Sequence, residues 1–298
     1  MNLLVFCCTM TDKSTVFQQK LTLNVCGRLV DLSKPKVMGI LNLTPDSFYD
    51  GGKHNTVTEA LKQTAQMLAE GADFIDLGAY SSRPKAEHIS REEELKRLIP
   101  VVKALVKEFP EAIFSIDTFR SEIAKAAVEE GAKIINDISA GEMDENMFKT
   151  ISKLRVPYII MHMKGTPQTM LQQTDYENLY AEVCNYFLQK IIKLKQMGIV
   201  DIMIDPGFGF AKTIEQSYEL LNKLDQFKVL GFPVLAGLSR KSMIYKLLET
   251  DAEHALNGTT VANTIALIKG ANILRVHDVA PAVEAVKIIQ KMSGYPQF

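Results

Sequence analysis

The chain has 298 residues, with 34 Lys and Arg against 35 Asp and Glu, so its net charge is −1. This balance excludes a protein that binds nucleic acid through a basic surface, because no positive charge is left over to neutralise phosphates. The chain also has no apolar run of about 20 residues that would span a bilayer, and no biased tract that would stay unfolded. We therefore expect a folded protein with no nucleic-acid and no membrane partner.

The segment Met1–Met10 is apolar but has no positively charged n-region and no small-residue cleavage site, so we predict no signal peptide. The four cysteines lack the spacing of a zinc site or a redox pair, and we expect reduced thiols. Both features favour the cytoplasm. We predict an N-terminal extension over residues 1–20, for which disorder is one interpretation, and a single domain over residues 21–298.

Residues 21–32 contain two alternating apolar segments broken at Gly27, a pattern typical of a β-hairpin. Eight short apolar segments follow, each suited to a strand that is buried on both faces of a parallel sheet. These strands are expected at Val37–Leu41, Phe74–Leu77, Ile113–Ile116, Lys133–Ile135, Tyr158–Met161, Ile202–Ile204, Val234–Ala236 and Ile273–Val276.

Helical periodicity follows each predicted strand. The helices are expected at Val57–Glu70, Glu92–Glu108, Ser121–Glu130, Glu145–Lys153, Tyr176–Met197, Ile214–Phe227, Lys241–Lys269 and Ala280–Met292. Eight strand–helix units predict an α/β fold, a (β/α)8 TIM barrel, with the short N-terminal hairpin closing its bottom. A doubly wound sheet is the alternative, although no Gly-x-Gly-x-x-Gly motif follows the first strand.

In such a barrel the active site lies at the carboxyl ends of the strands. Asp117, Asn136 and Asp205 each fall at a strand end, where their acceptors and amide suit a flat heterocycle with several N–H donors. Lys241, after the seventh strand, would donate to a carbonyl or ring nitrogen of the same ligand. The alternative for Asp117 and Asp205 is a helix N-cap.

Arg275 and His277 alternate along the last strand, so they share one face, and the closed barrel brings Asn42 of the first strand beside them. This pattern favours a corner for an anion or a metal-bound phosphate. The alternative is an arginine paired with a nearby carboxylate and a histidine with a structural role.

Two loops and one helix start complete the candidate site. Asp50 precedes two glycines in the first loop and Arg83 lies in the second, so both are candidates for mobile loops that close over the reacting centre. The alternative for each is a solvated loop charge. Ser242 opens a predicted helix and would receive a carboxylate, unless it is a simple N-cap.

Seven segments of the chain, taken together, resemble the dihydropteroate synthase family from about Val37 to the eighth unit. The segments are Asn42–Phe48 (NLTPDSF), Ser82–Pro84 (SRP), Ser115–Thr118 (SIDT), Asn136–Ser139 (NDIS), Asp205–Phe210 (DPGFGF), Ser239–Ser242 (SRKS) and Arg275–Asp278 (RVHD). The resemblance implies an enzyme, a transferase of folate biosynthesis that is a sulfonamide target. It would condense 6-hydroxymethyl-7,8-dihydropterin diphosphate with 4-aminobenzoate, giving dihydropteroate and diphosphate.

The resemblance also implies roles for individual residues, a Mg²⁺ cofactor and a homodimer. Asp117, Asn136, Met161, Asp205 and Lys241 would bind the pterin, and Asn42, Arg275 and His277 the diphosphate, with Asn42 also on the metal. Phe48, Ser82, Arg83, Pro84, Phe210 and Ser242 would surround the aminobenzoate. The catalytic set would be Asp117, Asp50, Arg83 and Lys241, with Asp117 stabilising a pterin-methylene cation.

The second loop departs from the family pattern. Where the family reads Gly-Gly-Glu-Ser-Thr-Arg-Pro-Gly, residues 78–85 read GAYSSRPK, so Tyr80 replaces an acidic residue and Ser82 replaces threonine. Two alternative functions stay open: a non-catalytic pterin-binding paralogue, which Tyr80 favours, and a methyltetrahydrofolate-binding methyltransferase barrel.

Overall fold

The computed structural model describes residues 20–43, 52–81 and 88–292. Eight strands form one parallel sheet in the order β8-β7-β6-β5-β4-β3-β10-β9. Ile204 in β8 forms a parallel bridge with Val234, which directly precedes β9, and this bridge joins the two ends of the sheet. The sheet therefore closes into the predicted (β/α)8 barrel, and a doubly wound open sheet is excluded.

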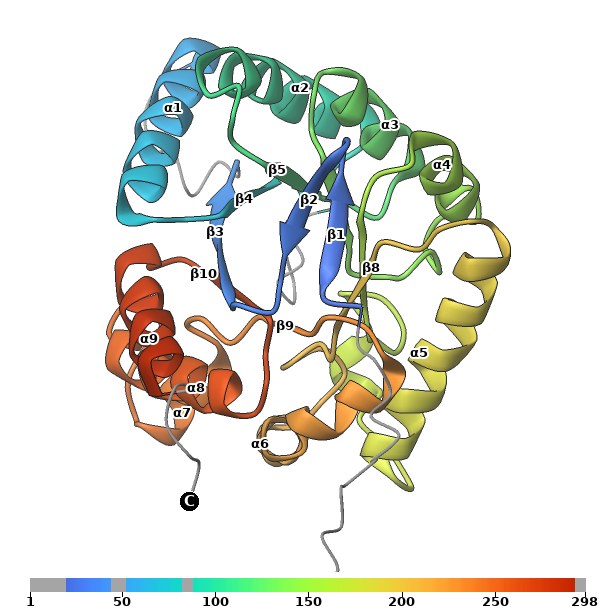
Figure 1. The fold of residues 1–298 in the computed structure, drawn as a ribbon, viewed down its shortest axis with the longest axis vertical. Coiled ribbons are helices and arrows are strands. Elements are labelled where there is room, and N and C mark those ends of the chain that lie inside the picture. The colour runs from blue at the N-terminus through green and yellow to red at the C-terminus, as the bar shows by residue number, and fades with distance from the viewer. Residues whose placement is uncertain (1–19, 44–51, 82–87, 293–298) are drawn as a thin grey trace, which may run out of the picture.

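The strands of the barrel are β3 (Lys36–Asn42), β4 (Phe74–Gly78), β5 (Phe114–Asp117), β6 (Ile134–Asp137), β7 (Tyr158–Met161), β8 (Ile202–Asp205), β9 (Leu235–Ala236) and β10 (Ile273–Val276). The surrounding helices are α1 (Gly52–Glu70), α2 (Arg91–Glu108), α3 (Ser121–Glu129), α4 (Met147–Leu154), α5 (Leu179–Gln196), α6 (Ile214–Asn222), α7 (Ser242–Leu247), α8 (Leu256–Ile268) and α9 (Val279–Met292). Short 3₁₀ helices lie at η2 (Met170–Gln172) and η3 (Leu224–Leu230). Figure 1 shows the helices arranged as a ring around the strands.

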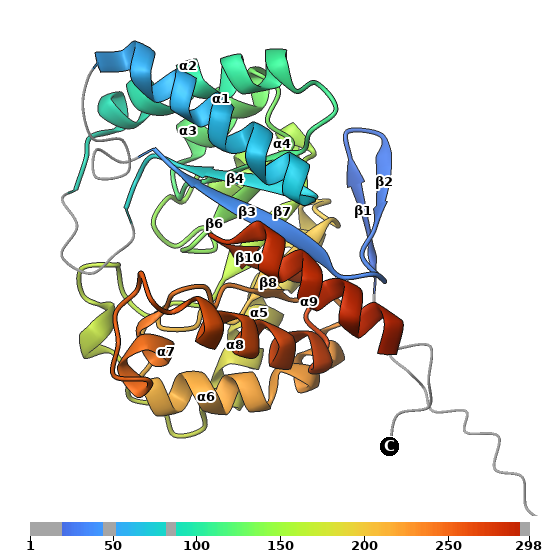
Figure 2. The ribbon, with the colours of Figure 1, turned by 90° about the vertical axis from the view of Figure 1, so that its left-hand side faces the viewer.

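The N-terminal hairpin pairs β1 (Thr22–Val25) with β2 (Arg28–Asp31) in antiparallel register, as predicted. It lies at one end of the barrel, opposite the carboxyl ends of β3 and β4 (Figure 2). Its buried side chains join one inward-facing residue from each barrel strand to form an apolar floor. The floor consists of Leu23, Val25, Leu32, Met38, Phe74, Ile113, Ile134, Ile159, Met203, Leu235 and Ile273.

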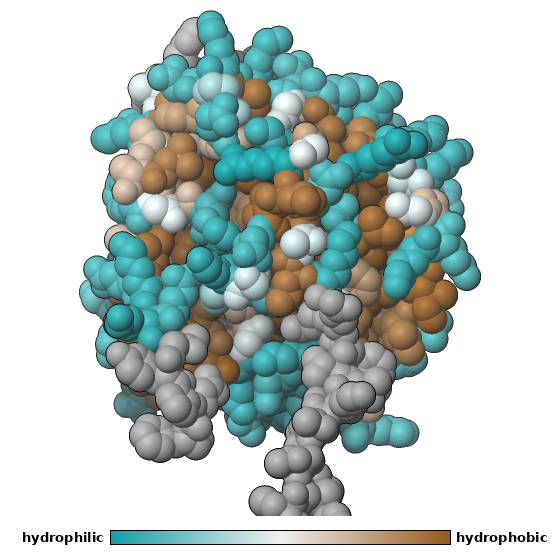
Figure 3. Space-filling model, viewed as in Figure 1, coloured by the Kyte–Doolittle hydropathy of each residue, from teal (hydrophilic) through white to brown (hydrophobic). Residues whose placement is uncertain are grey.

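Burying this floor removes several large aliphatic side chains from water, each a stabilisation of about 1.5–3 kcal/mol. A second, larger apolar cluster lies between the strands and the outer helices. Viewed from the hairpin side, the surface is largely hydrophilic over the outer helices, and apolar atoms show toward the middle (Figure 3). The buried carboxylates and amide of the barrel interior, Asp76, Asn136 and Asp205, lie above this floor.

The helix starts follow local capping rules. Thr213 and Gln216 form a reciprocal capping box at the start of α6, and the Asn178 side chain accepts from the backbone of Ala181 at the start of α5. Because these side chains satisfy backbone N–H groups that the helix leaves free, they fix where each helix begins.

The prediction of one helix over Lys241–Lys269 is wrong. The chain instead forms α7 and α8, and Glu249 between them adopts a left-handed φ of 52°. The Asp251 carboxylate then accepts hydrogen bonds from the backbone N–H groups of Glu253 and His254. An aspartate that bonds its own following backbone competes with the helical hydrogen bonds, so the helix is interrupted.

Candidate active site

Directly above the apolar floor, the barrel interior becomes polar. Because side chains alternate along each strand, the residue two positions after each floor residue faces the same interior. This second layer consists of Ile40, Asp76, Ser115, Asn136, Met161, Asp205, Gly237 and Arg275. Asn136, Met161, Asp205 and Arg275 were predicted as site residues, whereas Asp76 was missed by the sequence analysis.

Arg275 connects two carboxylates across the top of the barrel. Its Nε donates to Asp76 Oδ2 at 2.6 Å, and its Nη2 donates to Asp117 Oδ2 at 2.7 Å. The structure therefore brings Arg275 to the pterin-side residue Asp117, an arginine–carboxylate pairing that the sequence had left as an alternative. Burial by itself would lower the pKa of Arg275, but the Asp76 and Asp117 carboxylates raise it by more, so the pKa stands above its usual value and this cation is permanent.

Asp117 is the carboxylate best placed to change its charge near neutral pH. Burial raises its pKa to about 7; the Arg275 charge opposes this shift and the Asp76 charge adds to it. The helix that follows it, α3, has Arg120 as its N-cap, so the N-cap alternative for Asp117 is wrong. The Asn136 side chain completes this group by donating from Nδ2 to Asp76 Oδ2 at 2.9 Å.

Asp205 and Lys241 form a second charged pair across the barrel from Asp117. Burial raises the pKa of Asp205, an effect that the Lys241 charge opposes, while burial lowers the pKa of Lys241 to about 8. The Lys241 ammonium donates to the Phe208 carbonyl and lies 4.7 Å from the centre of the Phe210 ring. Because α6 has Thr213 as its N-cap, Asp205 is not a helix cap either.

Gly237 lies beside this pair. A Cβ added at Gly237 would stand 3.7 Å from Asp205 Oδ2 and 4.0 Å from Lys241 Nζ. Gly237 therefore lies against both charged groups without a side chain to cover them. A flat ring with N–H donors and a carbonyl would meet both an acceptor and a donor there.

The loop after β8 is held in place by Asp205 and by two buried groups that the sequence analysis did not single out, Lys212 and His162. Asp205 Oδ1 accepts from the Gly207 backbone N–H at 2.8 Å. Lys212 Nζ donates to the carbonyls of Gly207 at 3.1 Å and Phe210 at 2.9 Å and lies 2.9 Å from His162 Nδ1. Burial, reinforced by the Lys212 charge, lowers the pKa of His162 to about 2, so this histidine is neutral.

Position 207 in this loop requires glycine. Gly207 has a φ of 71°, and a Cβ there would stand 2.2 Å from the His162 carbonyl oxygen. The Asp-Pro-Gly sequence is therefore a structural condition for bringing the loop over the barrel mouth.

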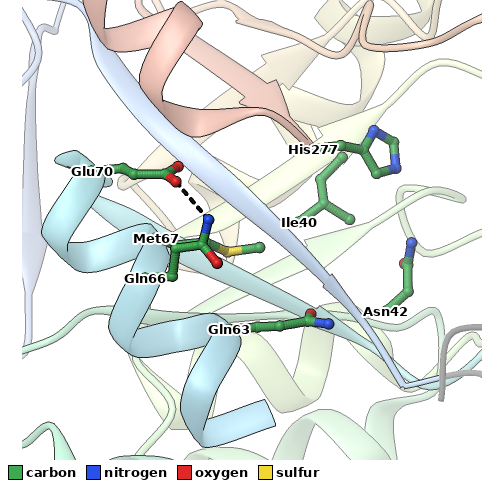
Figure 4. Close-up of a pocket in the computed structure, with 7 residues that line it drawn as sticks. All are labelled: Ile40, Asn42, Gln63, Gln66, Met67, Glu70 and His277. Atoms are coloured by element: carbon green, nitrogen blue, oxygen red, sulfur yellow. Dashed lines mark hydrogen bonds between the residues drawn. The ribbon is translucent and has the colours of Figure 1, made fainter. Parts of the chain in front are cut away.

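Asn42 and His277 line a cavity of about 350 Å³ beside β3. Figure 4 shows them on one side of β3, with side chains of α1 (Gln66, Met67 and Glu70) on the other. His277 Nδ1 lies 3.0 Å from the Ser239 hydroxyl, which also accepts from the His277 backbone N–H at 3.2 Å. The Asn42 amide and the His277 imidazole of the predicted anion corner thus line one cavity, to which α1 also contributes the Glu70 carboxylate.

The remaining predicted residues divide into two groups. Phe210 and Ser242 are described: Phe210 lies beside Lys241, and Ser242 is the first residue of α7, whose N-cap is Lys241. The alternative of Ser242 as the N-cap is therefore wrong. Phe48, Asp50, Ser82, Arg83 and Pro84 lie outside the described residues, as does most of the predicted extension over residues 1–20.

Tyr80, the departure from the family pattern, is buried in an apolar cluster at the barrel mouth that includes Met161 and Phe119. Its ring meets the Phe119 ring edge-on, with centroids 5.0 Å apart. Its hydroxyl accepts from Gln168 Nε2 at 3.0 Å and lies 3.1 Å from His88 Nδ1. Tyr80 therefore links the segment after β4 to the segments after β5 and β7.

Replacing Tyr80 with phenylalanine is expected to lower the free energy of unfolding by about 1 kcal/mol, because the ring packing stays while the buried hydrogen bonds are lost. Urea unfolding measures this change. As a control, Tyr180→Phe removes one exposed hydrogen bond to the Gln226 carbonyl and should cost less. Equal stability of wild type and Tyr80→Phe would show that the hydroxyl contributes nothing to this link.

Among the described residues, no group of three or more His, Cys, Asp or Glu side chains could hold a metal ion. No helix in the described segments is long and apolar enough to cross a membrane.

The chain is similar to known proteins over most of its length. The family model "Pterin binding enzyme" matches residues 38–277. The dihydropteroate synthase of Escherichia coli is 42% identical over 266 residues, which cover 89% of this chain and 94% of that protein.

Two solved structures are similar to this chain over nearly its whole length. The Yersinia pestis dihydropteroate synthase in a sulfonamide complex has a TM-score of 0.87 and 38% identity, covering 92% of this chain and 100% of that chain. The Xanthomonas albilineans enzyme with 4-aminobenzoic acid has a TM-score of 0.86 and 40% identity, covering 93% and 99% of the two chains. With its closed barrel, polar inner layer and near full-length similarity, the chain belongs to the dihydropteroate synthase family of pterin-binding enzymes.

Proposed function

We propose that the protein condenses 6-hydroxymethyl-7,8-dihydropterin diphosphate with 4-aminobenzoate to give 7,8-dihydropteroate and diphosphate. The observation that carries this proposal is the polar site at the strand ends, in which Asp117, Asn136 and Asp205 lie with two cations, Lys241 and Arg275. The site offers acceptors for the N–H groups of a ligand and a donor for its carbonyl, and this pattern is complementary to the edge of a pterin ring. The Xanthomonas relative binds 4-aminobenzoic acid, which supports the second substrate.

In this proposal Asp205 and Asn136 accept hydrogen bonds from the pterin, and Lys241 donates to its carbonyl or ring nitrogen. Met161, which is buried at the end of β7, packs against the ring. The diphosphate lies toward Asn42 and His277, where the cavity opens, with Arg275 between the two halves of the substrate. Asp50 and Arg83 would complete the closed site.

In this reaction diphosphate leaves before the aniline nitrogen attacks. The bond between the methylene carbon and the diphosphate oxygen breaks, its electron pair leaves with diphosphate, and the methylene carbon becomes cationic. The Asp117 carboxylate stabilises this cation, and the aniline nitrogen then donates its lone pair to the carbon and releases a proton. An arylamine needs no deprotonation before attack, so charge stabilisation at the carbon matters more than a general base.

The proposed aminobenzoate site uses Phe210 and Lys241 as one wall and the first turn of α7, at Ser242, for the carboxylate. Phe48, Ser82, Arg83 and Pro84 would supply the other side. Phe210 and Lys241 support this assignment by position, because the ring and the ammonium lie 4.7 Å apart at the barrel mouth.

The proposed metal is Mg²⁺, with Asn42 as its protein ligand. An amide oxygen is a hard ligand suited to Mg²⁺, which in proteins usually keeps several waters and completes its coordination with substrate phosphates. The lack of an acidic metal cluster in the described residues fits such a site. When bound, Mg²⁺ would neutralise charge on the departing diphosphate.

We also propose a homodimer that forms through α7, α8 and α9, which lie side by side (Figure 2). Exposed apolar side chains gather on these helices at Leu247, Leu248, Val261, Ile265, Ile268 and Ile288. An apolar face of this extent is typical of an interface between subunits. Sedimentation velocity should give the mass of a dimer, and Ile265→Glu should shift it toward monomer; a monomeric wild type would refute the proposal.

The cytoplasm is the compartment we propose. The cysteines in the described part of the chain, Cys26 and Cys184, carry free thiols, as expected where thiols are kept reduced.

Diphosphate release from 6-hydroxymethyl-7,8-dihydropterin diphosphate tests the proposed reaction. With Mg²⁺, release that depends on 4-aminobenzoate and yields dihydropteroate supports it. Pterin binding without release would instead identify a non-catalytic pterin-binding paralogue.

A further inference from the structure

Asp76 is a fully buried carboxylate in the middle of β4, with 0% of its surface exposed. It lies between the floor residue Phe74 and Gly78 at the strand end, and all three face the barrel interior. Its neighbours across the sheet are Ile40 on β3 and Ser115 on β5. Asp76 is thus placed one layer below Asp117 and in the same layer as Asn136 and Arg275, which we assign to substrate.

One oxygen of this carboxylate is shared by two residues of the site. Asp76 Oδ2 accepts from Arg275 Nε at 2.6 Å and from Asn136 Nδ2 at 2.9 Å. An amide beside a carboxylate must turn its NH₂ group toward it, so the carbonyl oxygen of Asn136 is left for other partners. Asp76 therefore determines that the carbonyl oxygen of Asn136, and not its NH₂ group, is available to a ligand.

Asp76 also fixes the direction of the guanidinium. Arg275 is bound by Asp76 through Nε and by Asp117 through Nη2. The two carboxylates lie on different strands and bind different nitrogens of the same guanidinium, which fixes the orientation of its plane. The side chain of Asp117 is 16% exposed and that of Asp76 is fully buried, so only Asp76 is hidden from substrate behind the arginine.

The other oxygen, Asp76 Oδ1, has no hydrogen-bond partner among the described residues, and neither has the buried Ser115 hydroxyl opposite it. Buried polar atoms without partners are costly.

We propose that Asp76 is a positioning residue of the substrate site, whose buried carboxylate holds the Arg275 guanidinium and the Asn136 amide in the orientation in which they meet the pterin diphosphate. The proposal rests on the proposed function for the identity of the ligand. The carboxylate itself does not touch the reacting atoms.

The test compares Asp76→Asn with wild type. The variant keeps the shape of the side chain and removes its charge, so we expect the KM for 6-hydroxymethyl-7,8-dihydropterin diphosphate to rise at least tenfold. The KM for 4-aminobenzoate should change less than twofold. A uniform structural defect would lower the amount of active enzyme and leave both KM values unchanged.

Asp137→Asn is the matched control. Asp137 is equally buried on β6, two strands away in the sheet, but its partners are Ser139, Gly141 and Tyr158, none of which we assign to the site. Its loss should lower the thermal unfolding midpoint without raising the KM for the pterin diphosphate. Asp76→Ser, which is smaller and leaves room for water, replaces Asp76→Asn if the latter does not fold.

A binding measurement separates this inference from the proposed reaction. Calorimetry with 6-hydroxymethylpterin should show at least tenfold weaker binding to Asp76→Asn. The double variant, Asp76→Asn combined with Asn136→Ala, should bind this pterin no more weakly than the single variant Asn136→Ala. A wild type that binds this pterin but forms no dihydropteroate would refute the proposed reaction alone. Wild-type KM and affinity in both Asp76 variants would overturn the positioning role.

Discussion

Replacing Asp117 with asparagine is expected to lower kcat roughly 100-fold or more, the size of effect seen when one preorganised electrostatic group is lost. Asparagine fills the same space but carries no charge to stabilise the methylene cation. It can still accept a hydrogen bond from Arg275 Nη2, which lies 2.7 Å from the carboxylate in the wild type. Pterin affinity should therefore fall much less than kcat, and steady-state kinetics with a thermal unfolding control measures both.

The pH dependence of the same pair of proteins provides a second measurement. Burial raises the pKa of Asp117 to about 7, and only its ionised form can stabilise the cation. In the wild type, kcat/KM should fall as the pH drops below about 7, because this ratio reports groups of the free enzyme. It should also fall above about 8, where Lys241 loses its proton.

Asp117→Asn should lose the acidic limb and keep the alkaline one. If the variant keeps an acidic limb at the same pH, another group titrates there and Asp117 is not the cation's partner. A kcat near that of wild type would reject the catalytic assignment outright.

Replacing Asp205 with alanine is expected to weaken the binding of 6-hydroxymethylpterin about 30-fold or more. Ligand N–H donors would be left without an acceptor in a buried site, a loss of about 2 kcal/mol or more, and 1.4 kcal/mol corresponds to tenfold in affinity. Lys241 would also lose the nearby charge that opposes the lowering of its pKa. Isothermal titration calorimetry measures the affinity directly.

Two further variants separate the causes of this loss. Asp205→Asn keeps an oxygen that can accept from the Gly207 N–H, so it tests the charge while the loop stays anchored. Asp201→Ala removes an aspartate at the other end of the same strand, where it pairs with Lys20 at 2.7 Å, and should leave pterin binding unchanged. Near-normal binding by Asp205→Ala would show that the pterin does not lie against this carboxylate.

The local sequence pattern was sufficient to predict the barrel. Each strand is a nearly continuous apolar segment followed by an amphipathic helix, and such local patterns need no knowledge of partners. The polar residues at the strand ends also followed, because a closed parallel barrel leaves one end for all of them. Asp117, Asn136, Asp205, Lys241 and Arg275 were all found in this way, and the structure brings them around one interior.

The hydrogen-bond and ion-pair partners of these groups depend on the tertiary structure. Asp76 was missed because it stands within an apolar strand, although an aspartate two residues before an inward-facing strand end was the signal that could have found it. Arg275 was predicted near Asn42 and His277, whereas its guanidinium binds Asp76 and Asp117. The partners of a buried side chain are set by the register between strands that are distant in sequence, and this register depends on how the whole barrel closes.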